Sequence, residues 1–92
     1  MQTLRGKGKI YNINNKYIDD VTYDICYNSV NSVDMPEWQG EITPANGTMP
    51  LGSYIIELDD GRRGPCTTGI VTYSSFGLVV DTFSVEGTGP LE

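Results

Sequence analysis

The sequence predicts an all-β protein, a single small antiparallel β-barrel or half-barrel of about six strands that are joined mainly by hairpins, with no substantial helix. Glycine makes up 11 of the 92 residues, which exceeds the usual share of about 7%, and β-branched and aromatic residues are plentiful. Several segments alternate apolar and polar residues with a period of two, as half-buried strands do. No segment combines helical spacing of apolar residues with capping residues, so we expect no helix longer than one turn.

The first two predicted strands, residues 3–13 and 17–28, form a hairpin. Between them lie Asn14 and Asn15, and asparagine tolerates the left-handed conformation that a two-residue hairpin loop requires. The register set by this loop brings apolar residues or glycines together on the inner side and opposite charges together on the outer side. The expected pairs are Leu4 with Ile25, Gly6 with Tyr23, Gly8 with Val21, Arg5 with Asp24, and Lys9 with Asp20. The Tyr23 ring is expected to cover the space beside Gly6.

A loop, a short strand and a second loop are predicted next. Residues 29–37 show no period and carry Asn, Ser, Asp and Pro, which indicates a loop. Residues 38–43 alternate, with Trp38 on the apolar side, and Pro44 ends this third strand. Residues 44–53 are rich in turn formers, and a loop of this length is either a mobile rim or a binding element.

Residues 54–73 form the second predicted hairpin. Asp60-Gly61 lies between an apolar run and a β-branched run, and this dipeptide favours a two-residue type I′ turn. That turn would pair Asp59 with Arg62, and it would place Pro65 opposite Ile56 at a site without cross-strand hydrogen bonds. Pro65 therefore indicates a bulge, or a point at which the outer side of the strand has no neighbour.

The last predicted strand covers residues 78–86, after a turn over 74–77. Val79, Phe83 and Val85 share one of its faces, which Asp81 interrupts. The tail 87–90 is expected to fray because it has no side chains to hold it. Residues 91–92 are interpreted as a cloning remnant, which leaves 1–90 as one domain.

The composition disfavours several classes of partner. Twelve acidic and six basic residues give a net charge of −6, which repels the phosphates of nucleic acids. No apolar run approaches the length of about 18 residues that a membrane span requires. Cys26 and Cys66 are expected to be reduced thiols in a cytoplasmic protein, since no secretory signal precedes the domain.

Few residues of this sequence have the arrangement that catalysis or metal binding requires. Histidine is absent, which removes the commonest general base and metal ligand. The two cysteines lack a CxxC partner, so they are interpreted as structural or incidental thiols. The charges of Asp59, Asp60, Arg62 and Arg63 could hold a cation or an anion, but charges at a hairpin tip are usually solvated. The acidic residues of the first hairpin are Asp19, Asp20 and Asp24. They lack the spacing of a calcium loop, so no metal is expected there, and no cofactor is expected elsewhere.

One short motif resembles a known family. The run Thr72-Tyr73-Ser74-Ser75-Phe76-Gly77 is similar to the second half of the signature of PilZ domains, in which an Asp or Asn, a Ser and a Gly precede a strand. Thr72 stands where the family has the acid or amide. The family's first half, two arginines spaced RxxxR, has no counterpart, because Arg62 and Arg63 are adjacent. The resemblance would imply a six-stranded barrel that binds cyclic di-GMP.

We therefore expect a noncatalytic binding or protein-interaction module, monomeric or weakly dimeric, that uses either the loop 44–53 or an unpaired strand edge. The alternative is a binding site for a small ligand, such as a nucleotide, in a barrel mouth formed by Trp38, Arg62 and Arg63. Trp38 is at the same time interpreted as a core anchor, and only exposure beside the loop would make it a binding residue. The least expected function is an enzyme built on Asp81 with Asp59 or Asp60.

Overall fold

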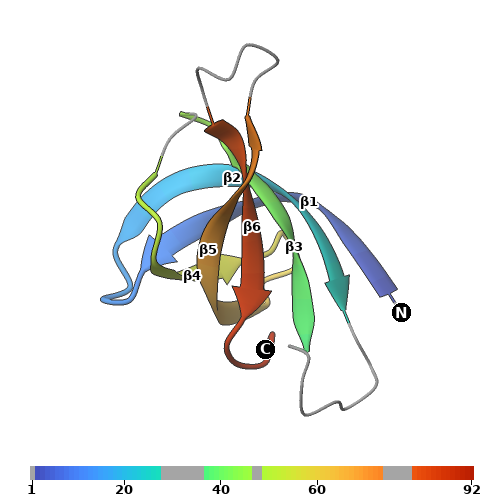
Figure 1. Cartoon of the computed structure of the whole chain (residues 1–92). Coiled ribbons are helices and arrows are strands. Elements are labelled where there is room, and N and C mark those ends of the chain that lie inside the picture. Colours follow the sequence, from blue (N-terminus) through green and yellow to red (C-terminus); the bar gives the residue numbers. More distant parts are fainter. Residues whose placement is uncertain (1, 28–36, 47–48, 74–79) are drawn as a thin grey trace.

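A computed structural model describes residues 2–27, 37–46, 49–73 and 80–92. Six antiparallel strands form a closed barrel (Figure 1), and the described residues include no helix. The predicted fold class is confirmed. The strands are β1 (Gln2–Asn12), β2 (Tyr17–Tyr27), β3 (Trp38–Pro44), β4 (Ser53–Glu57), β5 (Arg63–Tyr73) and β6 (Val80–Gly87).

The strand order around the barrel is β1-β2-β3-β6-β5-β4. It consists of two three-stranded meanders, β1-β2-β3 and β4-β5-β6, which are joined where β3 pairs with β6 and where β1 pairs with β4. Because β3 and β4 are consecutive in the chain but are not neighbours in the sheet, the loop between them has to cross from one meander to the other. The predicted loop over 29–37 and the predicted turn over 74–77 lie almost wholly outside the described residues.

The register of the first hairpin is confirmed. Cα partners run from Gln2 with Tyr27 to Ile10 with Asp19, and Gly6 faces Tyr23. The predicted two-residue loop is wrong, because the register shifts after Ile10 and the N–H of Asn12 bonds to the carbonyl of Lys16, which leaves a three-residue loop, 13–15. The cause is the Asn12 side chain, whose Oδ1 accepts hydrogen bonds from two backbone N–H groups in and beside the loop and so favours the longer connection. Within it Asn15 has the left-handed conformation, with φ of 66°.

The second hairpin differs from its predicted register by one residue. Leu58 donates its N–H to the carbonyl of Arg62 at 2.8 Å, so the loop has three residues and Gly61 takes the positive φ of 91° that this loop type requires. The predicted pairing of Asp59 with Arg62 is therefore wrong, and Pro65 faces Ile55 instead of Ile56. Pairing of β5 with β6 begins only at the residue after Pro65, but the outer side of Pro65 is not without a neighbour, because the N–H of Thr88 bonds to the Pro65 carbonyl.

The barrel is filled by apolar side chains from all six strands, at the alternate positions that the sequence pattern predicts. Trp38 is fully buried, and its Nε1 donates a hydrogen bond to the carbonyl of Gly89 at 2.8 Å. A Cβ atom on Gly87 would lie 2.3 Å from this nitrogen, so the absence of a side chain there makes room for the indole. The interpretation of Trp38 as a core anchor is confirmed.

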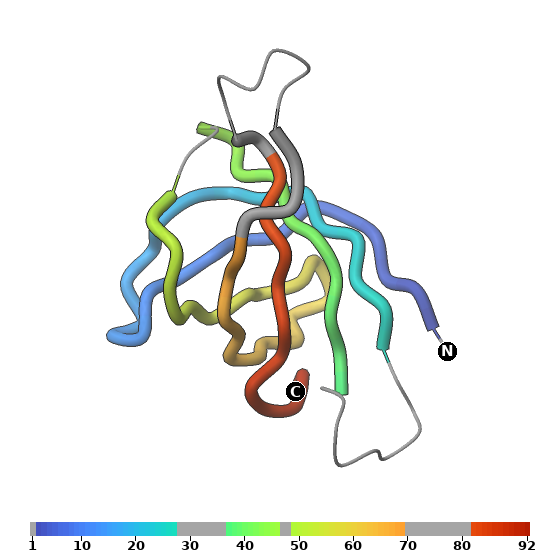
Figure 2. The backbone as a smooth tube through the Cα atoms, in the orientation of Figure 1, coloured from blue at the N-terminus to red at the C-terminus, as the bar shows by residue number. Residues whose placement is uncertain are grey.

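The expectation that the C-terminal tail frays is wrong. The N–H of Thr88 bonds to the carbonyl of Pro65 at 2.9 Å, and the N–H of Glu92 bonds to the carbonyl of Arg63 at 2.8 Å. Leu91 is 7% exposed and belongs to the core cluster, although it was expected to be part of a cloning remnant. Figure 2 shows the tail turning back beneath the barrel. Backbone hydrogen bonds and one apolar anchor hold a segment that lacks a strand pattern.

The loop 44–53 is attached to the barrel at several described residues, although most of its described side chains are exposed. Met49 is buried in the core cluster. Asp19, which is 5% exposed, accepts hydrogen bonds from the backbone N–H and the side-chain amide of Asn46. Asp19 therefore points inward and holds the loop, and it does not oppose a cation. On the far side of the loop, Gly52 and Thr68 exchange hydrogen bonds.

Candidate binding surface at the edge of strand β1

The three site residues predicted from the sequence do not converge on one opening. Trp38 lies inside the barrel. Arg62 is at the tip of the second hairpin, where its Nε is 2.8 Å from Oδ2 of Asp60. Arg63 is on the outer face, with its guanidinium 4.7 Å from the centre of the Tyr11 ring. The geometry does not support a ligand site in the barrel mouth.

The acidic groups considered for catalysis bond to neighbouring groups where the structure describes them, and Cys66 is a buried thiol, as predicted for a structural cysteine. Asp59 accepts a hydrogen bond from the Tyr23 hydroxyl at 2.9 Å. The backbone N–H and the side chain of Arg62 bond to Asp60 and lower the pKa of its carboxyl group. Burial raises the pKa of the Cys66 thiol to about 12, so very little nucleophilic thiolate forms at neutral pH. The side chain of Asp81 lies outside the described part of the chain.

Metal and membrane sites receive no support from the described residues. Over residues 2–27, 37–46, 49–73 and 80–92, no group of three or more His, Cys, Asp or Glu side chains is placed to hold a metal ion. Within the same ranges, no helix has the length and apolarity to cross a bilayer.

The barrel is closed on one side by a short stretch of pairing, and this leaves part of β1 with a single neighbour. β1 pairs with β2 from Gln2 to Tyr11, but it pairs with β4 only from Lys9 to Asn12. Within the described part of the chain, residues 2–8 therefore have a strand on one side only. Figure 1 shows this half of β1 running out from the barrel towards the N-terminus. We call residues 2–8 the β1 edge.

The direction of the backbone groups at the β1 edge follows from the hydrogen bonds at the other end of the strand. The N–H of Asn12 bonds to the carbonyl of Lys16, on the β2 side. Backbone groups of successive residues in a strand point to alternate sides, so even-numbered residues of β1 direct theirs towards β2. The odd-numbered residues Thr3, Arg5 and Lys7 thus direct their N–H and C=O groups to the open side.

The β1 edge begins where the β4–β5 turn leaves β1, and glycines allow this close crossing. A Cβ atom on Gly8 would lie 2.1 Å from the carbonyl oxygen of Glu57, and one on Gly6 would lie 2.6 Å from Oδ2 of Asp59. The Tyr23 ring lies against both glycines, as predicted for Gly6. Its hydroxyl donates to Asp59 and accepts the Asp59 N–H at 3.3 Å. Tyr23 therefore seals the core beneath the edge.

Three cations lie along the outer side of β1. Arg5, Lys7 and Lys9 are exposed and alternate along the strand, and they are half of the six basic residues of the chain. Nε of Arg5 is 3.2 Å from Oδ2 of Asp24, which confirms that predicted pair. Lys7 faces the neutral Thr22. A protein with a net charge of −6 thus concentrates positive charge along one strand.

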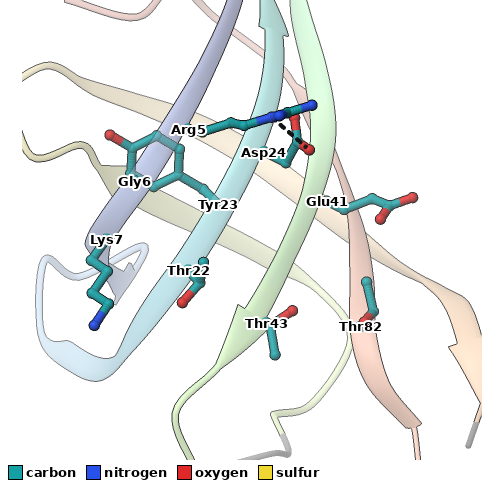
Figure 3. A pocket seen from close by; sticks show the side chains of 9 residues that line it. All are labelled: Arg5, Gly6, Lys7, Thr22, Tyr23, Asp24, Glu41, Thr43 and Thr82. Atoms are coloured by element: carbon teal, nitrogen blue, oxygen red, sulfur yellow. Dashed lines mark ion pairs between the residues drawn. The ribbon is translucent and has the colours of Figure 1, made fainter.

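Two open hollows meet at Lys7. One, of about 390 Å³, crosses the outer face of β1, β2, β3 and β6 and includes Arg5, Thr22 and Thr43 (Figure 3). The other, of about 360 Å³, lies between β1 and the β4–β5 turn and includes Asp59. The surface on both sides of Lys7 is therefore concave and open to an approaching chain.

Sequence reasoning found the alternating cations but placed them only opposite the aspartates of β2. It missed the β1 edge, because the edge results from the small number of β4 residues that reach β1. The one available signal was that the apolar run before the Asp60-Gly61 turn, residues 54–58, is shorter than the first predicted strand, residues 3–13.

No protein-family model matches the chain, and no curated protein and no solved structure shows significant similarity to it. The part of the motif resembling PilZ domains that runs from Ser74 to Gly77 lies outside the described residues.

Proposed function

We propose that this protein is a noncatalytic protein-interaction module that binds an extended polypeptide segment by strand addition at the β1 edge. The supporting observation is that β1 has 11 residues, of which only the last four pair with β4. An edge with unpaired N–H and C=O groups is the surface that strand addition uses, since main-chain hydrogen bonds supply the affinity.

The other surfaces that we considered support binding less well. The loop 44–53 is attached to the barrel through Asp19, Met49 and Thr68, so these attachments restrict its use as a binding element. The polar groups of the second hairpin tip bond to one another. The β1 edge is the described feature whose hydrogen-bonding groups are directed away from the fold.

The first test asks whether the β1 edge accepts a strand at all. The probe is a phage-displayed library of random twelve-residue peptides selected on the intact protein, followed by amide hydrogen exchange with a selected peptide. In the free protein the amides of Arg5 and Lys7 should exchange faster than those of Gly6 and Gly8, which face β2. Bound peptide should slow exchange at Thr3, Arg5 and Lys7.

A pair of variants separates main-chain bonding from side-chain contacts. Lys7→Ala removes only the side chain, whereas Lys7→Pro also removes the edge N–H, which an edge strand tolerates. Lys7→Pro should bind the selected peptide at least about fivefold more weakly than Lys7→Ala does, as the loss of one hydrogen bond predicts. Equal binding to both variants, or a library without enriched peptides, would refute strand addition.

A further inference from the structure

The barrel already contains one example of the pairing that the β1 edge could make with another chain. β4 runs antiparallel to β1 and sets Glu57 opposite Lys9 in the register, and the Glu57 carboxylate accepts a hydrogen bond from Tyr11 and lies 3.7 Å from Nε of Arg63. The line of β4 then stops, because the chain turns away at Leu58 and Asp59. Lys7 and Arg5 continue the row of cations along β1 without a strand beside them.

We infer that the β1 edge binds an acidic strand that continues the line of β4, antiparallel to β1, with carboxylates at two alternate positions opposite Lys7 and Arg5. This inference rests on the proposed function and adds the chemistry of the partner. Side chains directly opposite in neighbouring strands have Cβ atoms about 5 Å apart, and opposite charges at that distance stabilise the pair.

Lys7 is the main determinant in this arrangement. On the β2 side Arg5 already has Asp24 as a partner, whereas Lys7 faces Thr22. Lys7 also borders both hollows. A carboxylate can approach it from the hollow on the outer face that also includes Arg5, whereas the other hollow is lined by Asp20, Glu57 and Asp59, which repel negative charge. We expect the carboxylate opposite Lys7 to contribute more than the one opposite Arg5.

The inner side of the β1 edge selects the residues between the two carboxylates. Leu4 is half-buried and packs against the core, and the buried Tyr23 ring lies against Gly6 and Gly8, so this side of the edge is lined by apolar atoms. The carboxylate of Asp59 lies next to Gly6, where another negative charge would be repelled. The inward positions of the partner strand should therefore be apolar, which gives an alternating acidic and apolar segment.

A second copy of the chain is a poor partner for the β1 edge. Two β1 edges placed side by side would set Arg5 and Lys7 of one copy against the same cations of the other, in either strand direction. Like charges directly opposite are destabilising, and lysines on edge strands are a common device against self-pairing. The charge pattern thus favours a different, acidic chain.

The test uses three synthetic peptides and the full chain. The acidic peptide is acetyl-Thr-Val-Glu-Val-Glu-Val-Thr-amide, and the matched peptides carry Gln or Lys at both Glu positions. Dissociation constants and shifts of backbone amide resonances are measured for each peptide at low and at physiological ionic strength. The acidic peptide should bind about three- to tenfold more tightly than the Gln peptide, as two exposed ion pairs predict, and the difference should shrink with added salt.

Protein variants identify the cation that is responsible. Lys7→Gln should reduce the preference for Glu over Gln, and Lys7→Glu should reverse it in favour of the Lys peptide. Lys16→Gln removes an equal charge from the β1–β2 loop, outside the β1 edge, and should leave the preference unchanged. Retained fluorescence of Trp38 shows that each variant is folded.

The outcomes separate this inference from the proposed function. Equal binding of the Glu and Gln peptides, with slowed exchange at the β1 edge, would overturn the acidic partner and leave strand addition standing. Concentration-dependent protection of the same amides without peptide would overturn it in favour of a homodimer. If neither these peptides nor the random library perturbs the β1 edge, both proposals fail.

Discussion

The side chain of Tyr23 combines two functions that are usually separate in a small barrel. Its ring supplies the apolar volume that Gly6 and Gly8 lack, and its hydroxyl forms two hydrogen bonds with Asp59 at the start of the β4–β5 turn. Burial raises the pKa of Tyr23, in keeping with a neutral hydroxyl at the edge of the core. One residue thus connects the first hairpin to the second.

Tyr23→Phe tests the hydroxyl separately from the ring. The substitution keeps the ring over the two glycines but leaves Asp59 without the hydroxyl, so we expect a loss of about 1 to 2 kcal/mol in the free energy of unfolding. Urea unfolding followed by Trp38 fluorescence measures it. Tyr17→Phe is the control, because the Tyr17 hydroxyl bonds to Asp20 at the exposed surface and its loss should cost less than about 0.5 kcal/mol. Equal effects of the two substitutions would contradict the role of Tyr23.

The buried thiol of Cys66 is expected to lower the free energy of unfolding as the pH rises above 9. Burial raises the pKa of its thiol from 9.0 to about 12, so above pH 9 the unfolded chain loses this proton while the folded chain keeps it. The unfolded state then binds fewer protons than the folded state, and stability falls as pH rises from 9 towards 12, by roughly 1 kcal/mol per pH unit. Below pH 9 this contribution is fully present.

Cys66→Ala removes this titration. The variant should lose about 1 kcal/mol at neutral pH, because the removed sulfur leaves a small cavity, and its stability should fall less steeply above pH 9 than that of the unchanged protein. Unfolding free energies between pH 8 and 11, followed by Trp38 fluorescence, provide the comparison. Parallel pH profiles of the two proteins would show that the Cys66 thiol is not the group responsible.

At the scale of elements, the shortness of β4 determines where the barrel closes and where it stays open. β4 has five residues, four of which pair with the eleven-residue β1, and the end of β4 lies against β1 at Gly8. The two backbones lie close together here, since a Cβ atom on Gly8 would lie 2.1 Å from the carbonyl oxygen of Glu57. The β1–β4 pairing that closes the barrel and the β1 edge beside it therefore both depend on Gly8.

Gly8→Ala should disrupt this close approach. The methyl group would meet backbone, which has to move, so we expect a loss of about 2 to 3 kcal/mol in unfolding free energy. Gly6→Ala is the matched comparison, because its methyl group would meet the ends of the Asp59 and Tyr23 side chains, which can shift at a cost of about 1 kcal/mol. Thermal or urea unfolding ranks the two. A smaller effect at Gly8 than at Gly6 would mean that β4 does not close the barrel there.

At the scale of the whole molecule, the alternating pattern predicts which strand faces pair, whereas the exact loop lengths and the contacts between distant strands are missed. The pairing of Gly6 with Tyr23 was predictable, because one register alone satisfies both faces of the hairpin. The two hairpin loops were mispredicted because the side chain of Asn12 and the conformation of Gly61 each lengthen a turn locally. The β1 edge depends on how far β4 extends along a strand more than forty positions away, and no local pattern carries that information.

The C-terminal tail contributes to closing the barrel, although its sequence has no strand pattern. Leu91 packs among buried residues and lies against Gly64, and the indole of Trp38 also approaches this glycine. The Glu92 N–H bonds to the carbonyl of Arg63, so the tail joins the end of the chain to the start of β5. The tail thus covers one side of the tryptophan that anchors β3.

Leu91→Ala tests whether the tail stabilises the fold. Truncating a buried leucine predicts a loss of about 2 kcal/mol in unfolding free energy, at the lower end of the usual range because the residue lies at the margin of the core. Trp38 emission should shift to longer wavelength as water reaches the indole. Leu91→Met keeps the volume and should cost less than about 1 kcal/mol. Unchanged stability and emission in Leu91→Ala would mean that the tail frays in solution, as its composition alone suggests.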